Sequence, residues 1–489
     1  MKKTSVISFA FLSAITLNAQ TLNVNIGDVT YAIPAAQTGE MIYENGTTLS
    51  IGNKTYELND ITSISIDDSS VTDNTVEVTY SEDGAKVRIA GNIAEYITAN
   101  VNGGHVTIDA ADNLANELTY QLGGTSANGS FYMTGSYKMT LSFNDLSLSN
   151  PDSAAINIQN GKQINVVLNG TNNTLSDGLR SDDDGSDGHK AVFYVDGHTS
   201  WSGGGKLTIT GNVKHGFFSD EYTELGQDFG TLVINSTPGD GLHVNQYLKM
   251  SGGTVTINAQ GDGIDVGAKK TEKENNGQLM IEGGELQITV SGDAVKGMKC
   301  DNEMIISGGT VTVNTTGGVT YDATANDLSS CAAVKSGGTL NISGGTHYFA
   351  STGAGGKGIN STGVITVSGG STTVVTTGKV YEYNSSLDSK PQGVKSNGNI
   401  VLENGEILSC ASSDSGTAFK TDYLVLTNGA TVMGIGGKAT TAATSSTCSS
   451  KKYTGINVTG GSTVSYDGVS FIIPSIYSNS SARIIVSKK

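Results

Sequence analysis

A pair of turn-forming residues recurs through the second half of the chain, and this repeat limits the possible folds more than any other feature. The pairs are Gly-Gly or Asn-Gly and stand at 252–253, 283–284, 308–309, 344–345, 369–370, 404–405, 428–429 and 460–461. Successive steps alternate between 24–25 and 31–36 residues. Both dipeptides favour tight turns. A period of this kind predicts a repeat architecture whose units stack on one another.

The segments on both sides of each turn alternate apolar and polar residues, as half-buried strands do. Val255 and Ile257 after one turn, and Leu279 and Ile281 before the next, should therefore point inward. The chain has 65 glycines but only 5 prolines and no glycine at every third position, which excludes collagen. We predict an all-β chain that forms a parallel β-helix, a β-solenoid, from about residue 75 to 470.

The long steps contain the same coil plus an insertion before its first strand. These insertions fall at 267–277, 319–331, 379–391 and 439–453. Because they recur in one part of the coil, we expect them on one face, which is often the binding face of a repeat protein. Their tyrosines are candidates for stacking on sugar rings: Tyr321, Tyr381, Tyr383 and Tyr453. Trp201 stands in a strand pattern, where a core position is favoured over a sugar platform.

Counting back ten residues from the second residue of each turn pair reveals a column rich in lysine. It holds His243, Lys299, Lys335, Asn360 and Lys395, and Lys420 joins if its shorter coil lacks one residue. Lysines stacked about 5 Å apart repel each other unless anions or carboxylates screen them. The column is therefore either a strip that binds uronates or another acidic sugar polymer, or a set of solvated lysines that discourages aggregation of the sheet.

Aspartates gather at the corners of the predicted coils, where Gly-Asp dipeptides recur. The corner aspartates are Asp240, Asp262, Asp265 and Asp293, and a denser loop carries Asp177, Asp182 and Asp184. Ca²⁺ takes six to eight oxygen ligands, and such carboxylates could supply several of them. The alternative is that Asp and Gly simply suit turns. We predict calcium ligands at these seven positions.

The first nineteen residues have the parts of a secretory signal: Lys2 and Lys3, an apolar stretch, and Asn18–Ala19–Gln20 as a cleavage point. We therefore expect residues 1–19 to be a signal peptide, 20–70 a small N-terminal β module, and 71–489 the β-helix with C-terminal capping strands. No later segment is apolar enough to span a membrane. The mature chain is expected to be secreted, at the cell surface or periplasmic.

The net charge is −17, and loss of Lys2 and Lys3 with the signal would make it −19. A surface this acidic disfavours nucleic acid and suits cations. Catalytic motifs have little support, because the six histidines form no HExxH and no G-x-S-x-G is present. Arg180, beside Asp177 and Asp182, is the one place that resembles a calcium-dependent lyase site. No zinc spacing or disulfide is predicted for Cys300, Cys331, Cys410 and Cys448.

Four stretches, in this order, resemble a bacterial family of secreted carbohydrate-binding β-helix proteins that is similar to pectate lyases in fold but non-catalytic. They are AAINIQNGKQINVVLNGTNNTLSDG (154–178), KLTITGNVKHGFFSDE (206–221), GDGLHVNQYLKMSGGTVTI (239–257) and GDGIDVGAKKTEKENNGQLMIEGGELQI (261–288). The resemblance implies a right-handed, single-stranded parallel β-helix, bound Ca²⁺ at the corners of Asp240 and Asp262, and adhesion to cellulose or polygalacturonate. The chain departs from the family pattern at Val195–Asp196–Gly197–His198. The 21–68 segment resembles N-terminal segments of secreted Bacteroidetes proteins.

Three hypotheses follow. The first is a secreted, monomeric protein that binds pectin-like or cellulose-like polysaccharide without catalysis and uses calcium to bridge acidic sugars. The second is a calcium-dependent polysaccharide lyase. The third is a surface adhesin or structural β-solenoid with a protein partner.

Overall fold

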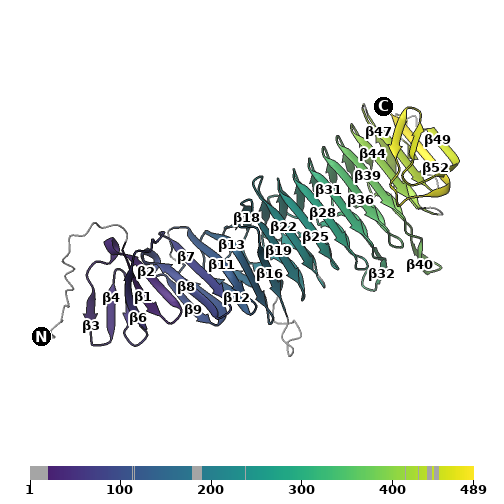
Figure 1. Ribbon diagram of the computed structural model, residues 1–489. Helices are drawn as coiled ribbons and strands as arrows, with labels where there is room; N and C mark the ends of the chain where they lie inside the picture. The colour runs from purple at the N-terminus through teal and green to yellow at the C-terminus, as the bar shows by residue number, and fades with distance from the viewer. Residues whose placement is uncertain are drawn as a thin grey trace. The chain divides into compact units, whose positions relative to one another are not determined.

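The computed structural model describes residues 20–488 apart from 113, 115, 179–189, 237, 413–414, 428, 438–442 and 445–450. The expected signal peptide, residues 1–19, therefore lies outside the described residues. The described chain is all-β, and its helices are two short 3₁₀ turns, η1 (Ala35–Gln37) and η2 (Gly91–Ile93) (Figure 1). None of the helices in these residues is long and apolar enough to cross a membrane. The chain divides into two compact units, Met1–Thr208 and Ile209–Lys489.

The first unit starts with antiparallel strands and continues as parallel ladders. Its strands are β1 (Thr21–Ile26), β2 (Val29–Pro34), β3 (Ile42–Glu44), β4 (Thr48–Ile51), β5 (Lys54–Glu57), β6 (Ser63–Asp67), β7 (Thr75–Ser81), β8 (Gly84–Ala90), β9 (Ile97–Asn102), β10 (Gly104–Ala110), β11 (Leu118–Ser126), β12 (Gly129–Thr134), β13 (Met139–Asn150), β14 (Ile156–Gln159), β15 (Ile164–Asn169), β16 (Asn173–Asp177), β17 (Ala191–Val195) and β18 (Thr199–Ser202). β1 pairs antiparallel with β2 and β6, whereas β2 pairs in parallel with β8. Parallel ladders then run β7–β11–β13–β15–β18 and β10–β12–β14–β17.

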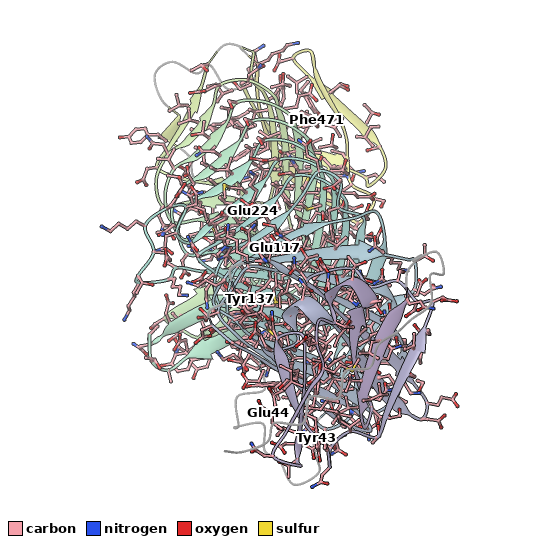
Figure 2. All side chains as sticks on the ribbon, turned by 90° about the vertical axis from the view of Figure 1, so that its left-hand side faces the viewer. Tyr43, Glu44, Glu117, Tyr137, Glu224 and Phe471 are labelled. Carbon is pink, nitrogen blue, oxygen red and sulfur yellow. The ribbon has the colours of Figure 1, made fainter. Side chains whose placement is uncertain are left out.

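The predicted 20–70 module corresponds to β1–β6. Its β3 carries Tyr43 and Glu44 (Figure 2) and pairs with β4 in a separate small sheet. The parallel pairing of β2 with β8 links these strands to the ones that follow. The boundary near residue 70 stays a prediction. Trp201 in β18 is 2% exposed, which confirms its predicted core position.

The second unit is a stack of coils with three strands each (Figure 1). The first ladder is β20 (His215–Ser219), β23 (Leu242–Asn245), β26 (Ile264–Gly267), β29 (Lys296–Cys300), β34 (Ala332–Ser336), β37 (Lys357–Ser361), β42 (Gln392–Ser396) and β45 (Thr417–Lys420). The second is β21 (Thr223–Leu225), β24 (Tyr247–Met250), β27 (Gln278–Ile281), β30 (Met304–Ile306), β35 (Leu340–Ile342), β38 (Ile365–Val367), β43 (Ile400–Leu402) and β46 (Tyr423–Leu426). The third is β22 (Thr231–Ser236), β25 (Thr254–Ala259), β28 (Glu285–Val290), β31 (Thr310–Thr315), β36 (Thr346–Ser351), β39 (Ser371–Thr376), β44 (Glu406–Ala411) and β47 (Thr431–Gly436). Neighbours in each ladder are parallel, so the unit is a β-solenoid-like fold; its predicted right-handed sense stays a prediction.

The turn pairs and the alternating strands behave as predicted. The second residue of each pair from Gly253 to Gly429 has a φ between 74° and 90°, a left-handed conformation that glycine adopts at little cost. Val255 and Ile257 are fully buried and lie in register with Leu286 and Ile288 of the next coil. The core is therefore a ladder of aliphatic side chains, interrupted by the buried His347, whose pKa burial lowers to about 4.

The chain continues with the C-terminal strands β49 (Lys451–Val458), β50 (Thr463–Tyr466), β51 (Val469–Ile472) and β52 (Asn479–Lys488); β49 pairs with β52, and β50 pairs with β51 in a separate sheet. β52 pairs antiparallel with β47, so it covers the edge that a further parallel coil would extend. Tyr477 and Ile484 join Met433 in one buried cluster, with Phe471 packed against it (Figure 2). Gly460–Gly461 lies among these antiparallel strands, so the prediction that it marks another parallel coil is wrong.

Two of the predicted insertions are antiparallel hairpins that project from the stack (Figure 1). They are β32 (Val319–Asp322) with β33 (Asp327–Ser330), and β40 (Tyr381–Asn384) with β41 (Leu387–Ser389). Ser330 Oγ and Ser389 Oγ lie 2.7 Å apart and join the hairpins. Beneath them, the buried Lys357 donates to Ser389 Oγ at 3.0 Å and to Gly355 O at 2.8 Å. Burial and the nearby charge of Lys395 lower the pKa of Lys357 to about 7.

Replacing Gly263 with alanine should destabilise the fold by about 1–3 kcal/mol, the usual cost of overpacking. A Cβ there would stand 2.4 Å from Ile288 Cγ2 and 2.5 Å from Gly297 O, whereas a Cβ on Gly204 meets nothing within 4 Å. Urea unfolding of Gly263→Ala, with Gly204→Ala as the control, measures this. Equal unfolding midpoints for the two variants would contradict the packing that we describe.

Lys357 should make stability rise with pH. Above about pH 7 the folded chain releases the Lys357 proton, while the unfolded chain keeps it up to about 10.5. Because the unfolded state then binds more protons, the free energy of unfolding gains up to about 1.4 kcal/mol per pH unit in that window. Unfolding at several pH values between 7 and 10 should show a shallower slope for Lys357→Met than for wild type. The exposed-lysine control Lys452→Met should keep the wild-type slope, and a wild-type slope in Lys357→Met would refute the assignment.

Candidate functional site

The first ladder of the second unit aligns one residue of each coil in a column, which we call the face column. Its members, in order along the stack, are Phe218, His243, Asp265, Lys299, Lys335, Asn360, Lys395 and Lys420. The six residues predicted by spacing are all present, including Lys420. Spacing missed Asp265 because the insertion that follows it breaks the count back from the turn.

A second column lies three residues earlier, where each coil turns into the ladder; we call it the corner column. Its members are His215, Asp240, Asp262, Lys296, Ala332, Lys357, Gln392 and Thr417. The next position is always glycine or alanine, because the core leaves little room there: a Cβ on Gly241, for example, would stand 2.3 Å from Ile257 Cγ2. Counted from the third ladder, Asp293 stands at the predicted corner, three residues after Val290 as Asp262 stands three residues after its partner Ala259, and it accepts the Gly318 N–H at 2.6 Å. On the first-ladder side, Lys296 takes the place beside Asp262.

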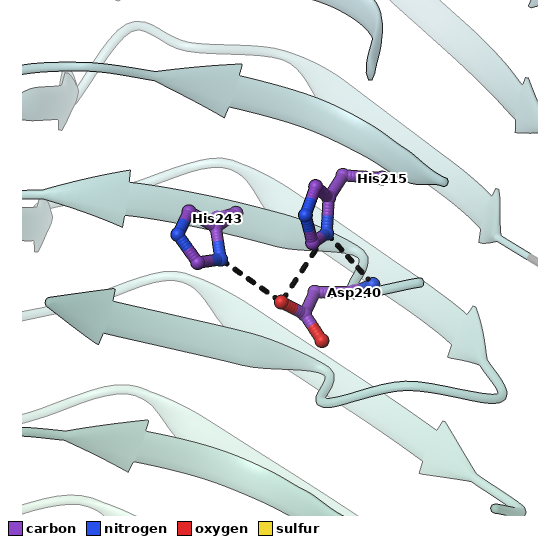
Figure 3. Close-up of side chains that lie close together, drawn as sticks. All are labelled: His215, Asp240 and His243. Atoms are coloured by element: carbon purple, nitrogen blue, oxygen red, sulfur yellow. Dashed lines mark hydrogen bonds and ion pairs between the residues drawn. The ribbon is translucent and has the colours of Figure 1, made fainter. Parts of the chain in front are cut away.

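The two columns begin with a histidine–aspartate cluster at Asp240 (Figure 3). Asp240 Oδ2 lies 2.9 Å from His243 Nδ1 and 3.2 Å from His215 Nδ1. Burial opposes ionisation of this carboxyl, but the two neighbouring imidazoles outweigh burial and hold the pKa of Asp240 well below its usual range. Sequence reasoning placed His243 and Asp240 in separate patterns and missed His215. The signal that could have identified His215 is the triplet Lys214–His215–Gly216, which stands one coil before Gly239–Asp240–Gly241.

Asp262 and Asp265 lie on the next coil and share Lys299. Lys299 Nζ is 2.9 Å from Asp265 Oδ2 and 3.8 Å from Asp262 Oδ2. Burial, together with the negative charges of Asp240 and Asp265, raises the pKa of Asp262 to about 6, although the Lys296 N–H opposes that shift. Asp265 Oδ1 is buried and has no hydrogen-bond partner among the residues that the structure describes. This half of the columns therefore concentrates negative charge.

The corner aspartates do not fit a calcium cage. Asp240 Oδ1 accepts the Asp262 N–H at 2.7 Å, and Asp262 Oδ1 accepts the Lys296 N–H at 2.6 Å. Imidazoles face Asp240 Oδ2, and the Lys299 ammonium faces Asp262 Oδ2 and Asp265 Oδ2. Among these three carboxylates only Asp265 Oδ1 is left without a partner in the described part of the chain, whereas Ca²⁺ requires six to eight oxygens. Asp177, at the end of β16, is buried, while Asp182 and Asp184 lie outside the described residues.

The other half of the face column is basic. In the part of the chain that the structure describes, no carboxylate lies within ion-pair distance of Lys335, Lys395 or Lys420. Lys335 donates to Thr362 Oγ1 at 3.0 Å, and its pKa is lowered by burial and then by the like charge of Lys395. An acidic protein thus carries a strip of uncompensated cations on one ladder, with Asn360 between Lys335 and Lys395.

The hairpin tyrosines form a stack rather than separate platforms. The rings of Tyr321 and Tyr383 lie 4.5 Å apart between centroids and are inclined by only 5°. Tyr321 also donates to Asn326 Oδ1, and Tyr383 is 46% exposed. Tyr381, at the start of β40, is half-buried. The tyrosine positions were predictable as insertion residues, but the pairing of two hairpins separated by fifty residues of sequence (331–380) was not.

Comparison with known proteins identifies the family of the chain but not the position of a site. None of the curated proteins compared matches the chain. Among solved structures, the polysaccharide lyase-like protein from C. thermocellum, in a gadolinium derivative, is similar over 60% of this chain and 96% of its own, with 18% identity and a TM-score of 0.41. A similarity this low supports no conclusion about this chain. The family model of carbohydrate-binding domain-containing proteins matches residues 102–382, more than half of the chain. The chain therefore belongs to the family of carbohydrate-binding domain-containing proteins.

Proposed function

We propose that this protein binds acidic polysaccharide without catalysis, along the basic half of the face column. The family supports carbohydrate as the ligand class. The observation that carries the anionic character of the ligand is the unpaired column of Lys335, Lys395 and Lys420. A polymer with a carboxylate on each sugar, such as polygalacturonate, can meet several of these amines at once, and each added contact raises the effective affinity.

The hairpins supply a second kind of contact beside the lysines. β33 and β41 each lead into a coil whose first-ladder strand carries a column lysine, Lys335 in β34 and Lys395 in β42. The outer faces of the Tyr321–Tyr383 stack can pack against the apolar faces of sugar rings. Charge then selects acidic polymers, and the aromatic stack adds binding that depends less on salt.

Calcium remains part of the proposal only for the 177–184 loop, since the corner aspartates do not fit it. Calcium bound there would neutralise carboxylates that otherwise repel a uronate. Chelated protein with and without millimolar Ca²⁺, compared on polygalacturonate and on cellulose, tests this dependence. The lyase alternative, which rests on Arg180 outside the described residues, is removed if no unsaturated uronate absorbance appears in the same mixtures. Export of the mature chain is likewise proposed.

Lys335→Gln/Lys395→Gln/Lys420→Gln should bind polygalacturonate about tenfold to a hundredfold more weakly than wild type, because each exposed ion pair is worth up to about 1 kcal/mol. Wild-type binding should also weaken with added salt. Affinity electrophoresis or calorimetry measures both effects.

The matched control removes the same charge elsewhere: Lys86→Gln/Lys206→Gln/Lys452→Gln, all exposed positions. If the control loses as much affinity as the column variant, the effect is one of net charge and the proposed strip is wrong. If wild type binds neutral and acidic polymers equally, the proposed selectivity fails while carbohydrate binding stands.

A further inference from the structure

We infer that His215, Asp240 and His243 form a binding site for a divalent transition metal of the Zn²⁺ class, distinct from any calcium site.

The coil repeat builds this cluster. His215 begins β20, and Phe217 pairs with Leu242, so His215 stands directly beside Asp240 on the next coil. Asp240 lies in the turn before β23, and His243 follows three residues later on the strand. One ligand atom from each residue lies within 4.8 Å of the others. The register of two adjacent coils, and not one local motif, thus gathers the three donors.

The donor distances suit a small tetrahedral ion. Zn²⁺ bonded at about 2.0–2.1 Å places neighbouring ligand atoms about 3.3 Å apart. Asp240 Oδ2 is 2.9 Å and 3.2 Å from the two Nδ1 atoms. Two imidazole nitrogens and one carboxylate oxygen are ligands that borderline transition metals prefer, whereas Ca²⁺ prefers oxygen alone. The same geometry therefore favours Zn²⁺ over Ca²⁺.

The surroundings hold these ligands in place. Asp240 Oδ1 accepts the Asp262 N–H, which orients the carboxylate so that Oδ2 faces the histidines. The His243 ring stacks on Phe218, with 4.8 Å between centroids and 11° between planes. Such supporting contacts orient the ligands of metal sites.

The contacts of His215 Nδ1 indicate that the cluster suits a cation. His215 Nδ1 accepts the Asp240 N–H at 3.0 Å while it lies 3.2 Å from Asp240 Oδ2. In the neutral imidazole this brings two electron-pair donors together, an arrangement that a cation at the cluster relieves. A metal ion must compete with that N–H for the nitrogen, which makes His215 the weaker of the two imidazole ligands.

The cluster is accessible from solvent. The side chains of His215, Asp240 and His243 are 11%, 14% and 23% exposed. A fourth ligand can therefore come from water or from a carboxylate of a bound molecule. If the proposed polysaccharide function holds, the metal adds a cation at the acidic end of the face column. The metal site itself does not depend on that function.

The test is metal binding by the full chain in the absence of polysaccharide. Chelated protein titrated with Zn²⁺ should take up one ion per chain, and Co²⁺ should give the visible absorption of a tetrahedral site. His243→Gln and Asp240→Asn should weaken Zn²⁺ binding at least about tenfold, since each removes a direct ligand. His105→Gln, which changes a half-buried histidine of the first unit, should bind as wild type does. Far-UV circular dichroism confirms that each variant is folded.

Three results would overturn the inference: no Zn²⁺ uptake by folded wild type, unchanged affinity in His243→Gln and Asp240→Asn, or displacement of Zn²⁺ by equimolar Ca²⁺. Zn²⁺ should also raise the unfolding temperature of wild type but not of His243→Gln, because an ion that binds only the folded state stabilises it. Polygalacturonate binding is measured separately. Failure of the Zn²⁺ test therefore does not refute polysaccharide binding, and failure of the polysaccharide test does not refute the metal site.

Discussion

In-register parallel pairing of successive coils is the constraint on which the second unit depends. Each residue of a ladder lies beside the equivalent residue of the next coil, as Leu286 lies between Val255 and Val311. Inside the stack this repetition is favourable, because equivalent aliphatic side chains bury each other. At the corners it demands a small residue on every coil, which is why glycine or alanine follows each corner position.

Outside the stack the same repetition has an electrostatic cost, since equal charges placed one coil apart repel each other. The two ends of the face column meet this cost differently. At the acidic end, Asp240 and Asp265 are paired with His243 and Lys299. At the basic end, Asn360 separates Lys335 from Lys395, and no described carboxylate compensates the lysines. A protein of net charge −17 that leaves this strip unpaired has a surface suited to an anionic polymer.

Much of this could be predicted from sequence because a solenoid converts sequence period into spatial neighbourhood. The turn pairs, the inward side chains and the lysine column all follow from counting. Counting fails where coils differ in length. The residues after Gly292 put Lys296, and not Asp293, beside Asp262, and the insertion after Asp265 hid its place in the face column. The closing antiparallel strands also fell outside the count, although Gly460–Gly461 imitates the repeat.

Local alternation and fixed spacing are properties of the chain, so they specify the coil repeat, the aliphatic core and the members of the basic column. Which charges meet is a property of the folded coils. The alignment of adjacent coils places His215 beside Asp240 and Lys299 beside Asp265. The relative position of the two hairpins stacks Tyr321 on Tyr383. Those contacts act over a few ångströms between residues that are far apart in sequence, so spacing alone does not specify them.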